Sequence, residues 1–194
     1  MATTRATLDP ALYPEGVDFP ATSAVAWSAI WAGAATAIAL TIILVAIGSG
    51  LGFMAASPWP GVGPKVTTFS IGAGIGLVIV QWLSSAVGGY IAGRLRTRWT
   101  GLHTHEAFFR DTAHGLITWA VATIVVVGVA VFISTLAGLA AAGPVDVSMT
   151  REAADEARKA AMTISLFTGV SMLVGAFVAS VAAAIGGQLR DRHP

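Results

Sequence analysis

The side chains best suited to chemistry lie in one segment, between residues 103 and 114. This segment contains His103, His105, Glu106 and His114, with neighbouring Arg and Asp residues. A His-x-His pair near a carboxylate has the donor types of a transition-metal site, so His103 and His105 are weak metal-ligand candidates. No second histidine lies on an apolar stretch that could face His114, which excludes bis-histidine haem ligation. No cofactor is expected.

The same segment has a second interpretation, as a loop at a membrane surface. Aromatic residues lie within it or next to it: Trp99, Phe108 and Phe109. Aromatic rings and arginines are typical of the lipid headgroup layer, where guanidinium groups meet phosphates. This interpretation is favoured over metal binding. It assigns four arginines to lipid headgroups, namely Arg94, Arg96, Arg98 and Arg110.

Gln81 is the one carboxamide deep in an apolar stretch. A polar residue within a membrane suggests a functional position by default. The favoured alternative is a structural hydrogen bond to a threonine of another helix, with Thr36, Thr123 and Thr168 as candidate partners. Proton-coupled transporters usually carry an ionisable group at this depth, and none is present. Because no Ser/His/Asp arrangement with supporting spacing occurs either, the protein is predicted not to be an enzyme.

Composition identifies the elements that carry these residues. The chain has 194 residues, 55% hydrophobic and 11% charged, whereas soluble domains carry roughly 25% charged residues. Four stretches without Asp, Glu, Lys, Arg or His each exceed the about 20 residues that a membrane helix needs. We expect an all-α four-helix transmembrane bundle over residues 21–194, after a polar tail at 1–20. The expected spans are about 24–53, 66–93, 112–142 and 160–189.

Charge and cysteine content narrow the partners. A net charge of +1 argues against nucleic acid, and the absence of cysteine excludes disulfides and thiolate metal sites. Arginine and lysine favour the cytoplasmic side of a membrane. One side would carry Arg5, Arg94, Arg96, Arg98, Arg110, Arg190 and Arg192, and the other Lys65, Arg151, Arg158 and Lys159. We therefore expect both termini to be cytoplasmic, in a bacterial inner membrane.

The segment before the fourth span is predicted to be helical and continuous with it. Thr150 is a plausible N-cap. Opposite charges four residues apart, in Arg151–Asp155 and Asp155–Lys159, stabilise a helix.

Small residues recur every four positions along the apolar stretches. Such spacing places them on one helix face, where two backbones can approach closely. The pattern predicts close packing within one bundle or, alternatively, association between chains. The residues concerned are Gly48, Gly52, Gly72, Gly76, Gly88, Gly89, Gly93, Ser171, Gly175, Ala179, Ala183 and Gly187.

The chain also has the pattern of two helical hairpins in tandem. The segment from Trp27 aligns with the segment from His114, and the second and fourth stretches both end in Gly-Gly. Trp27-Ser-Ala-Ile-Trp-Ala-Gly, Gly88-Gly-Tyr-Ile-Ala-Gly-Arg-Leu and Arg110-Asp-Thr-Ala-His-Gly-Leu-Ile-Thr-Trp resemble a family of small bacterial membrane proteins often labelled hypothetical or "PhnA-like". The resemblance covers most of the chain from Ala24 and implies no established activity.

Three functional hypotheses follow. The first is a non-enzymatic membrane protein that acts by association, as a homo-oligomer or as an accessory subunit of a larger inner-membrane complex, with lipids and membrane proteins as partners. The second is a pore or transporter for a small solute or ion, based on Gln81 and the hairpin repeat. The third is an interfacial metal-binding protein or enzyme that uses the histidine-rich loop.

Overall fold

The computed structural model describes residues 23–57, 59, 63–97, 103–140 and 150–192. These residues form four helices: α1 (Trp27–Ala55), α2 (Val66–Leu95), α3 (Thr104–Ala140) and α4 (Arg151–Arg192). Each is long and apolar enough to cross a membrane. The prediction of an all-α bundle of four membrane helices is therefore confirmed, and the chain is an integral membrane protein. The tail at 1–20 lies outside the described residues.

Two helices begin earlier than the apolar stretches suggested. Helix α3 begins at Thr104 rather than near residue 112, because its charged first turns favour a helix: Glu106 and Arg110, four residues apart, form an ion pair at 2.7 Å. Helix α4 runs unbroken for 42 residues, as predicted. Its N-cap Thr150 accepts a hydrogen bond from the Ala153 N–H at 3.2 Å.

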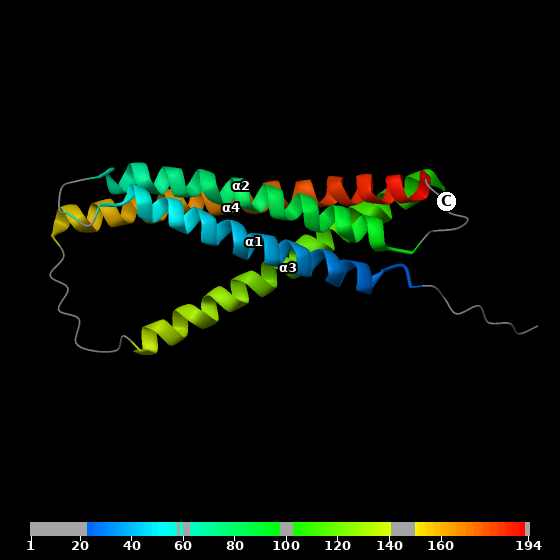
Figure 1. Ribbon diagram of the computed structural model, residues 1–194, viewed down its shortest axis with the longest axis horizontal. Coiled ribbons are helices and arrows are strands. Elements are labelled where there is room, and N and C mark those ends of the chain that lie inside the picture. Colours follow the sequence, from blue (N-terminus) through cyan, green and yellow to red (C-terminus); the bar gives the residue numbers. More distant parts are fainter. Residues whose placement is uncertain (1–22, 58, 60–62, 98–102, 141–149, 193–194) are drawn as a thin grey trace, which may run out of the picture.

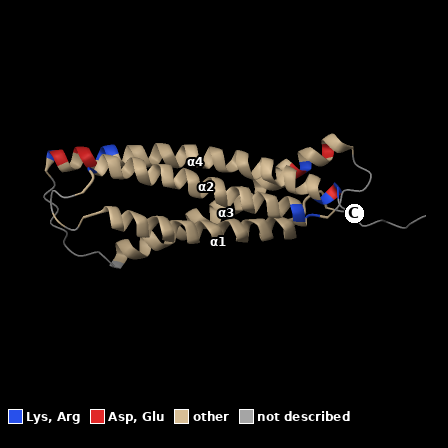
Figure 2. Cartoon of the chain, turned by 45° about the horizontal axis from the view of Figure 1, so that its top comes forward, with Lys and Arg blue, Asp and Glu red and all other residues tan. Residues whose placement is uncertain are grey.

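The polar first turns of α4 are stabilised by ion pairs along one face. Asp155 pairs with Lys159 at 2.7 Å, as expected, and its second partner is Arg158 at 2.8 Å. At 1.5 Å per residue, α4 is about 63 Å long, roughly twice the thickness of the hydrocarbon core. Its charged start therefore projects beyond the membrane. Figure 2 shows Lys, Arg, Asp and Glu gathered at the two ends of the bundle, with an uncharged middle.

The helices pack as two antiparallel hairpins, α1 with α2 and α3 with α4, joined through α2 and α4. Helices α2 and α4 run parallel and make the most extensive contact in the bundle. We call the end that contains Leu95 and Arg192 the closed end, and the end that contains Ala55 and Arg151 the open end. Toward the open end, α3 leans away from the other three helices (Figure 1). Every α3 residue from Val127 to Leu139 is exposed.

Candidate functional site

A buried ionic network joins three helices at the closed end. Arg96, directly after α2, donates to both carboxylate oxygens of Asp111 on α3, with Nη2···Oδ2 at 2.7 Å. The Arg96 side chain is 0% exposed and that of Asp111 is 2% exposed. Two parallel hydrogen bonds between a guanidinium and a carboxylate are strong and directional. The pair therefore fixes the end of α2 against the start of α3.

Helix α4 enters the same network through its last turn. Arg96 Nη2 also donates to Asp191 Oδ2 at 3.1 Å, and Arg190 donates to Asp191 Oδ1 at 2.6 Å. Arg190 further donates to the backbone carbonyl of Arg96. The position of Arg96 differs from the expectation that it would lie at lipid headgroups. A carboxylate on each of two neighbouring helices holds it inside the protein.

His114 ties α1 to the same end of the bundle. Its Nε2 accepts a hydrogen bond from the backbone N–H of Ala26 at 2.8 Å, and its Nδ1 lies 2.6 Å from the carbonyl oxygen of Arg110. Because a carbonyl can only accept, Nδ1 is the donor in this contact and Nε2 is the acceptor for Ala26. Ala26 is the N-cap of α1 and has no capping side chain of its own. His114 thus caps a helix of the other hairpin.

The two Gly-Gly pairs allow each even-numbered helix to touch two neighbours at once. On α2, Gly88 faces Gly33 and Ala37 of α1, while Gly89 faces Ala179 of α4. On α4, Gly186 faces the carbonyl of Tyr90 on α2, while Gly187 faces a carboxylate on α3. In each pair one glycine packs against the partner helix of its own hairpin and the other packs across the bundle. No side chain larger than hydrogen fits at these contacts.

The predicted small-residue positions divide into two groups. Those in contact with another helix include the whole set on α4: Ser171, Gly175, Ala179, Ala183 and Gly187, all buried. Gly93 packs against Ala183 of α4, and Gly52 lies near Phe69 of α2. A Cβ at the remaining positions would meet no neighbouring atom within 4 Å; these are Gly48, Gly72 and Gly76, along with Gly50, Gly128, Gly138 and Gly169. All of the second group lie in the half of the bundle toward the open end.

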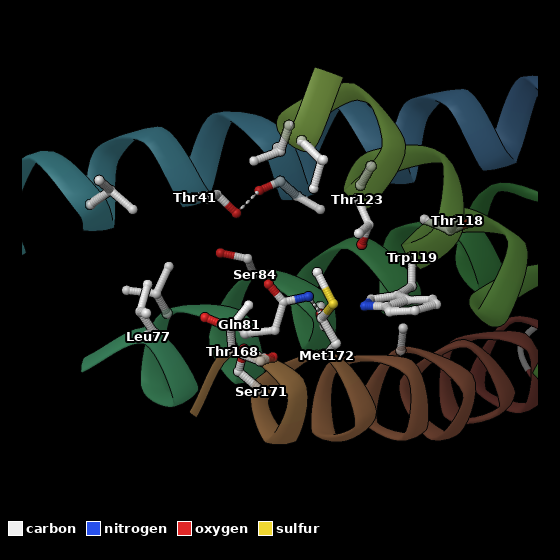
Figure 3. A pocket seen from close by; sticks show the side chains of 18 of the residues that line it. Thr41, Leu77, Gln81, Ser84, Thr118, Trp119, Thr123, Thr168, Ser171 and Met172 are labelled. Atoms are coloured by element: carbon white, nitrogen blue, oxygen red, sulfur yellow. Dashed lines mark hydrogen bonds between the residues drawn. The ribbon is translucent and has the colours of Figure 1, made fainter. Parts of the chain in front are cut away.

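A cavity of about 350 Å³ lies between the four helices in the membrane interior. Figure 3 shows hydroxyl, carboxamide and indole groups directed into it. The polar side chains that line it are Thr41, Gln81, Ser84, Ser85, Thr118, Trp119, Thr123, Thr168 and Ser171. No charged side chain lines this cavity. Gln81 does not bond to the threonines predicted for it; its Nε2 lies 3.5 Å from Ser85 Oγ on the same helix.

Three buried polar atoms at this cavity have no hydrogen-bond partner within the part of the chain that the structure describes. They are Ser84 Oγ, Thr118 Oγ1 and Trp119 Nε1. Ser84 is 2% exposed and Thr118 is 1% exposed. Gly175 leaves room for the Trp119 and Gln81 side chains, because a Cβ there would lie 2.8 Å from Trp119 Nε1 and 2.5 Å from Gln81 Nε2. An unpaired buried polar group costs about 1–3 kcal/mol, so these groups call for a partner.

The structure gathers the other predicted residues into no site. His103 and His105 are exposed, and no group of three metal-ligating side chains occurs among the residues the structure describes. Arg94 is half-buried in the last turn of α2, and Arg110 pairs with Glu106. Arg98 lies outside the described residues.

Sequence reasoning missed the residues that build the two interior features. At the closed end it missed Asp191 as a partner of Arg96, and in the cavity it missed Ser84, Thr118 and Trp119. A usable signal was present: Ser84-Ser85 and Thr118-Trp119 are adjacent polar pairs, the first well inside an apolar stretch and the second near the start of one. Hydroxyls alone are weak evidence in membrane helices, because they commonly bond to their own backbone.

These features define a multi-pass α-helical membrane protein with an ionic closed end and an uncharged polar cavity. No protein-family model matches the sequence, and no curated protein or solved structure matches it. The resemblance to the PhnA-like family therefore stays a prediction.

Proposed function

We propose that the protein is a non-enzymatic membrane protein that works by association with a second copy of itself through the outer face of α2. The observation that carries this proposal is the Gly72-x-x-x-Gly76 pair. It is the spacing that lets two membrane helices approach backbone to backbone. In the described part of the chain, a Cβ placed on either glycine would have no neighbouring atom within 4 Å.

The contrast with the other small-residue faces supports this proposal. The face of α4 from Ser171 to Gly187 packs inside the chain, as does the part of α2 around Gly89 and Gly93. The Gly72–Gly76 face is instead flanked by exposed isoleucines, Ile71 and Ile75. Small residues give no packing advantage against lipid tails, whereas they let a facing helix approach closely.

A second copy fits this face because the motif is self-complementary. In a two-fold contact the same patch lies on both subunits. Two Gly72–Gly76 faces can cross with their isoleucines packing on either side, without any other sequence being required. An accessory role in a larger complex would use the same face with a different helix.

Replacing Gly76 with leucine is expected to convert the protein from an oligomer to a monomer. The added side chain would hold the two α2 backbones apart, and overpacking of about 1–3 kcal/mol lowers an association constant about tenfold or more. Native mass spectrometry of the detergent-solubilised protein measures the stoichiometry.

Gly169→Leu is the control, since a Cβ at Gly169, as at Gly76, would meet no neighbour within 4 Å, but Gly169 lies on α4. It should keep the wild-type stoichiometry. A monomeric wild-type protein, or equal oligomer content in both variants, would show that the α2 face does not mediate self-association.

We further propose that the protein lies in a bacterial inner membrane with its closed end toward the cytoplasm. The support is the excess of arginine at that end. A C-terminal fusion to alkaline phosphatase should be inactive, and the matching fusion to a fluorescent protein should be bright. An active phosphatase fusion would reverse the assignment.

A further inference from the structure

The cavity between the helices has its unpaired polar groups at its inner end and two exposed valines at its mouth. Its unpaired groups, Ser84, Thr118 and Trp119, lie about 17–22 Å from the closed ends of their helices, at 1.5 Å per residue. The cavity reaches the surface between α1 and α3, where its lining residues Val45 and Val127 are 43% and 44% exposed. The cavity is thus polar and buried at its inner end and apolar at its mouth.

We infer that this cavity binds an uncharged amphiphile, with an oxygen-bearing head at Ser84, Thr118 and Trp119 and an apolar chain leaving between α1 and α3. The head must carry an acceptor, since the indole N–H of Trp119 can only donate. The two hydroxyls can donate or accept, so a hydroxyl or carbonyl group on the head pairs with either.

The absence of charge among the lining residues sets the charge of the ligand. A charged head in the membrane interior needs an opposite charge or a water-filled path. The buried ionic groups Arg96 and Asp111 are already paired with each other at the closed end. An uncharged head incurs no such cost and satisfies the three unpaired atoms.

The form of the cavity distinguishes an amphiphile from a small polar solute. A volume of about 350 Å³ lies within the range of small-molecule sites and far above the space of one water molecule. Its mouth opens on a lipid-facing surface rather than at a charged end of the bundle. Thr123 and Val126 on α3 and Thr41 on α1 line the path between the polar end and the mouth.

The test uses the full-length protein in phosphatidylcholine nanodiscs, with 1,2-dioctanoylglycerol as the uncharged amphiphile. We expect a saturable change in tryptophan emission that is absent in Trp119→Phe. Ser84→Ala combined with Thr118→Val should weaken binding about tenfold, because two hydrogen bonds are lost while volume is nearly kept. Ser134→Ala, at an exposed serine on the outer part of α3, should bind as the wild type does.

Two further probes test whether the ligand needs both an apolar chain and an uncharged head. Glycerol carries hydroxyl groups without an apolar chain, and dodecyl phosphate carries an apolar chain with a charged head; neither should produce the change. Equal binding of glycerol would make the cavity a site for a polar solute, and equal binding of dodecyl phosphate would remove the charge argument. No response to dioctanoylglycerol, or an unchanged response in the Ser84/Thr118 variant, overturns the proposal. Gly76→Leu should bind normally, so this test is independent of self-association.

Discussion

Replacing Arg96 with methionine will destabilise the folded protein by about 3–5 kcal/mol, the usual cost of removing one partner of a buried ion pair. Asp111 would be left buried without the guanidinium that binds both its oxygens. The link from α2 to Asp191 on α4 would be lost as well. Unfolding in mixed micelles titrated with dodecyl sulfate, followed by circular dichroism, measures the change.

Removing both partners should restore much of that loss. In Arg96→Met/Asp111→Leu no buried charge is left alone, and exchanges of this kind are often neutral or stabilising. Asp191 keeps its pair with Arg190. Arg94→Met, two residues earlier in the last turn of α2 and only half-buried, should change stability by less than about 0.5 kcal/mol. If Arg96→Met were as stable as Arg94→Met, the network would not hold the closed end together.

Gly93→Leu is the second substitution with a large expected effect, at the upper end of the about 1–3 kcal/mol cost of overpacking. A Cβ at Gly93 would lie 2.9 Å from the Ala183 Cα and inside the contact distance of the Ala183 carbonyl oxygen. That obstacle is backbone, which cannot rotate out of the way as a side chain can. Helices α2 and α4 would have to separate, and the same unfolding titration reports the loss.

Gly76→Leu provides the comparison on the same helix, because no atom lies within 4 Å of the added carbon. The monomer of this variant should unfold at the wild-type detergent ratio. Equal stability of Gly93→Leu and Gly76→Leu would mean that α2 and α4 do not pack through their glycines.

The number and type of the helices could be predicted because lipid imposes a simple rule. A backbone in hydrocarbon must satisfy its own hydrogen bonds, so each long uncharged stretch becomes a helix. The continuation of α4 back to Arg151 followed from local charges and a cap. The start of α3 did not, because a charged segment between two spans reads equally well as a loop.

The interior features depend on geometry that spacing along the chain does not contain. Asp111 lies 15 residues from Arg96 along the chain, and Asp191 lies 95 residues from it. The packing of three helices brings them together. An arginine next to a span is usually at lipid headgroups, so its burial could not be read from its position. The cavity likewise exists because α3 diverges from the other helices and because Gly175 has no side chain beside Trp119.

The divergence of α3 also has a mechanical consequence. From Val127 to Leu139 every residue of the helix is exposed, so about 18 Å of α3 has no neighbouring helix against it. A swing of about 10° at Val127 would carry the far end of this segment about 3 Å, roughly half a helical pitch. Because Val127 lines the mouth of the cavity, any displacement of this segment would change the width of that mouth, whereas Asp111 stays tied to Arg96 at the closed end.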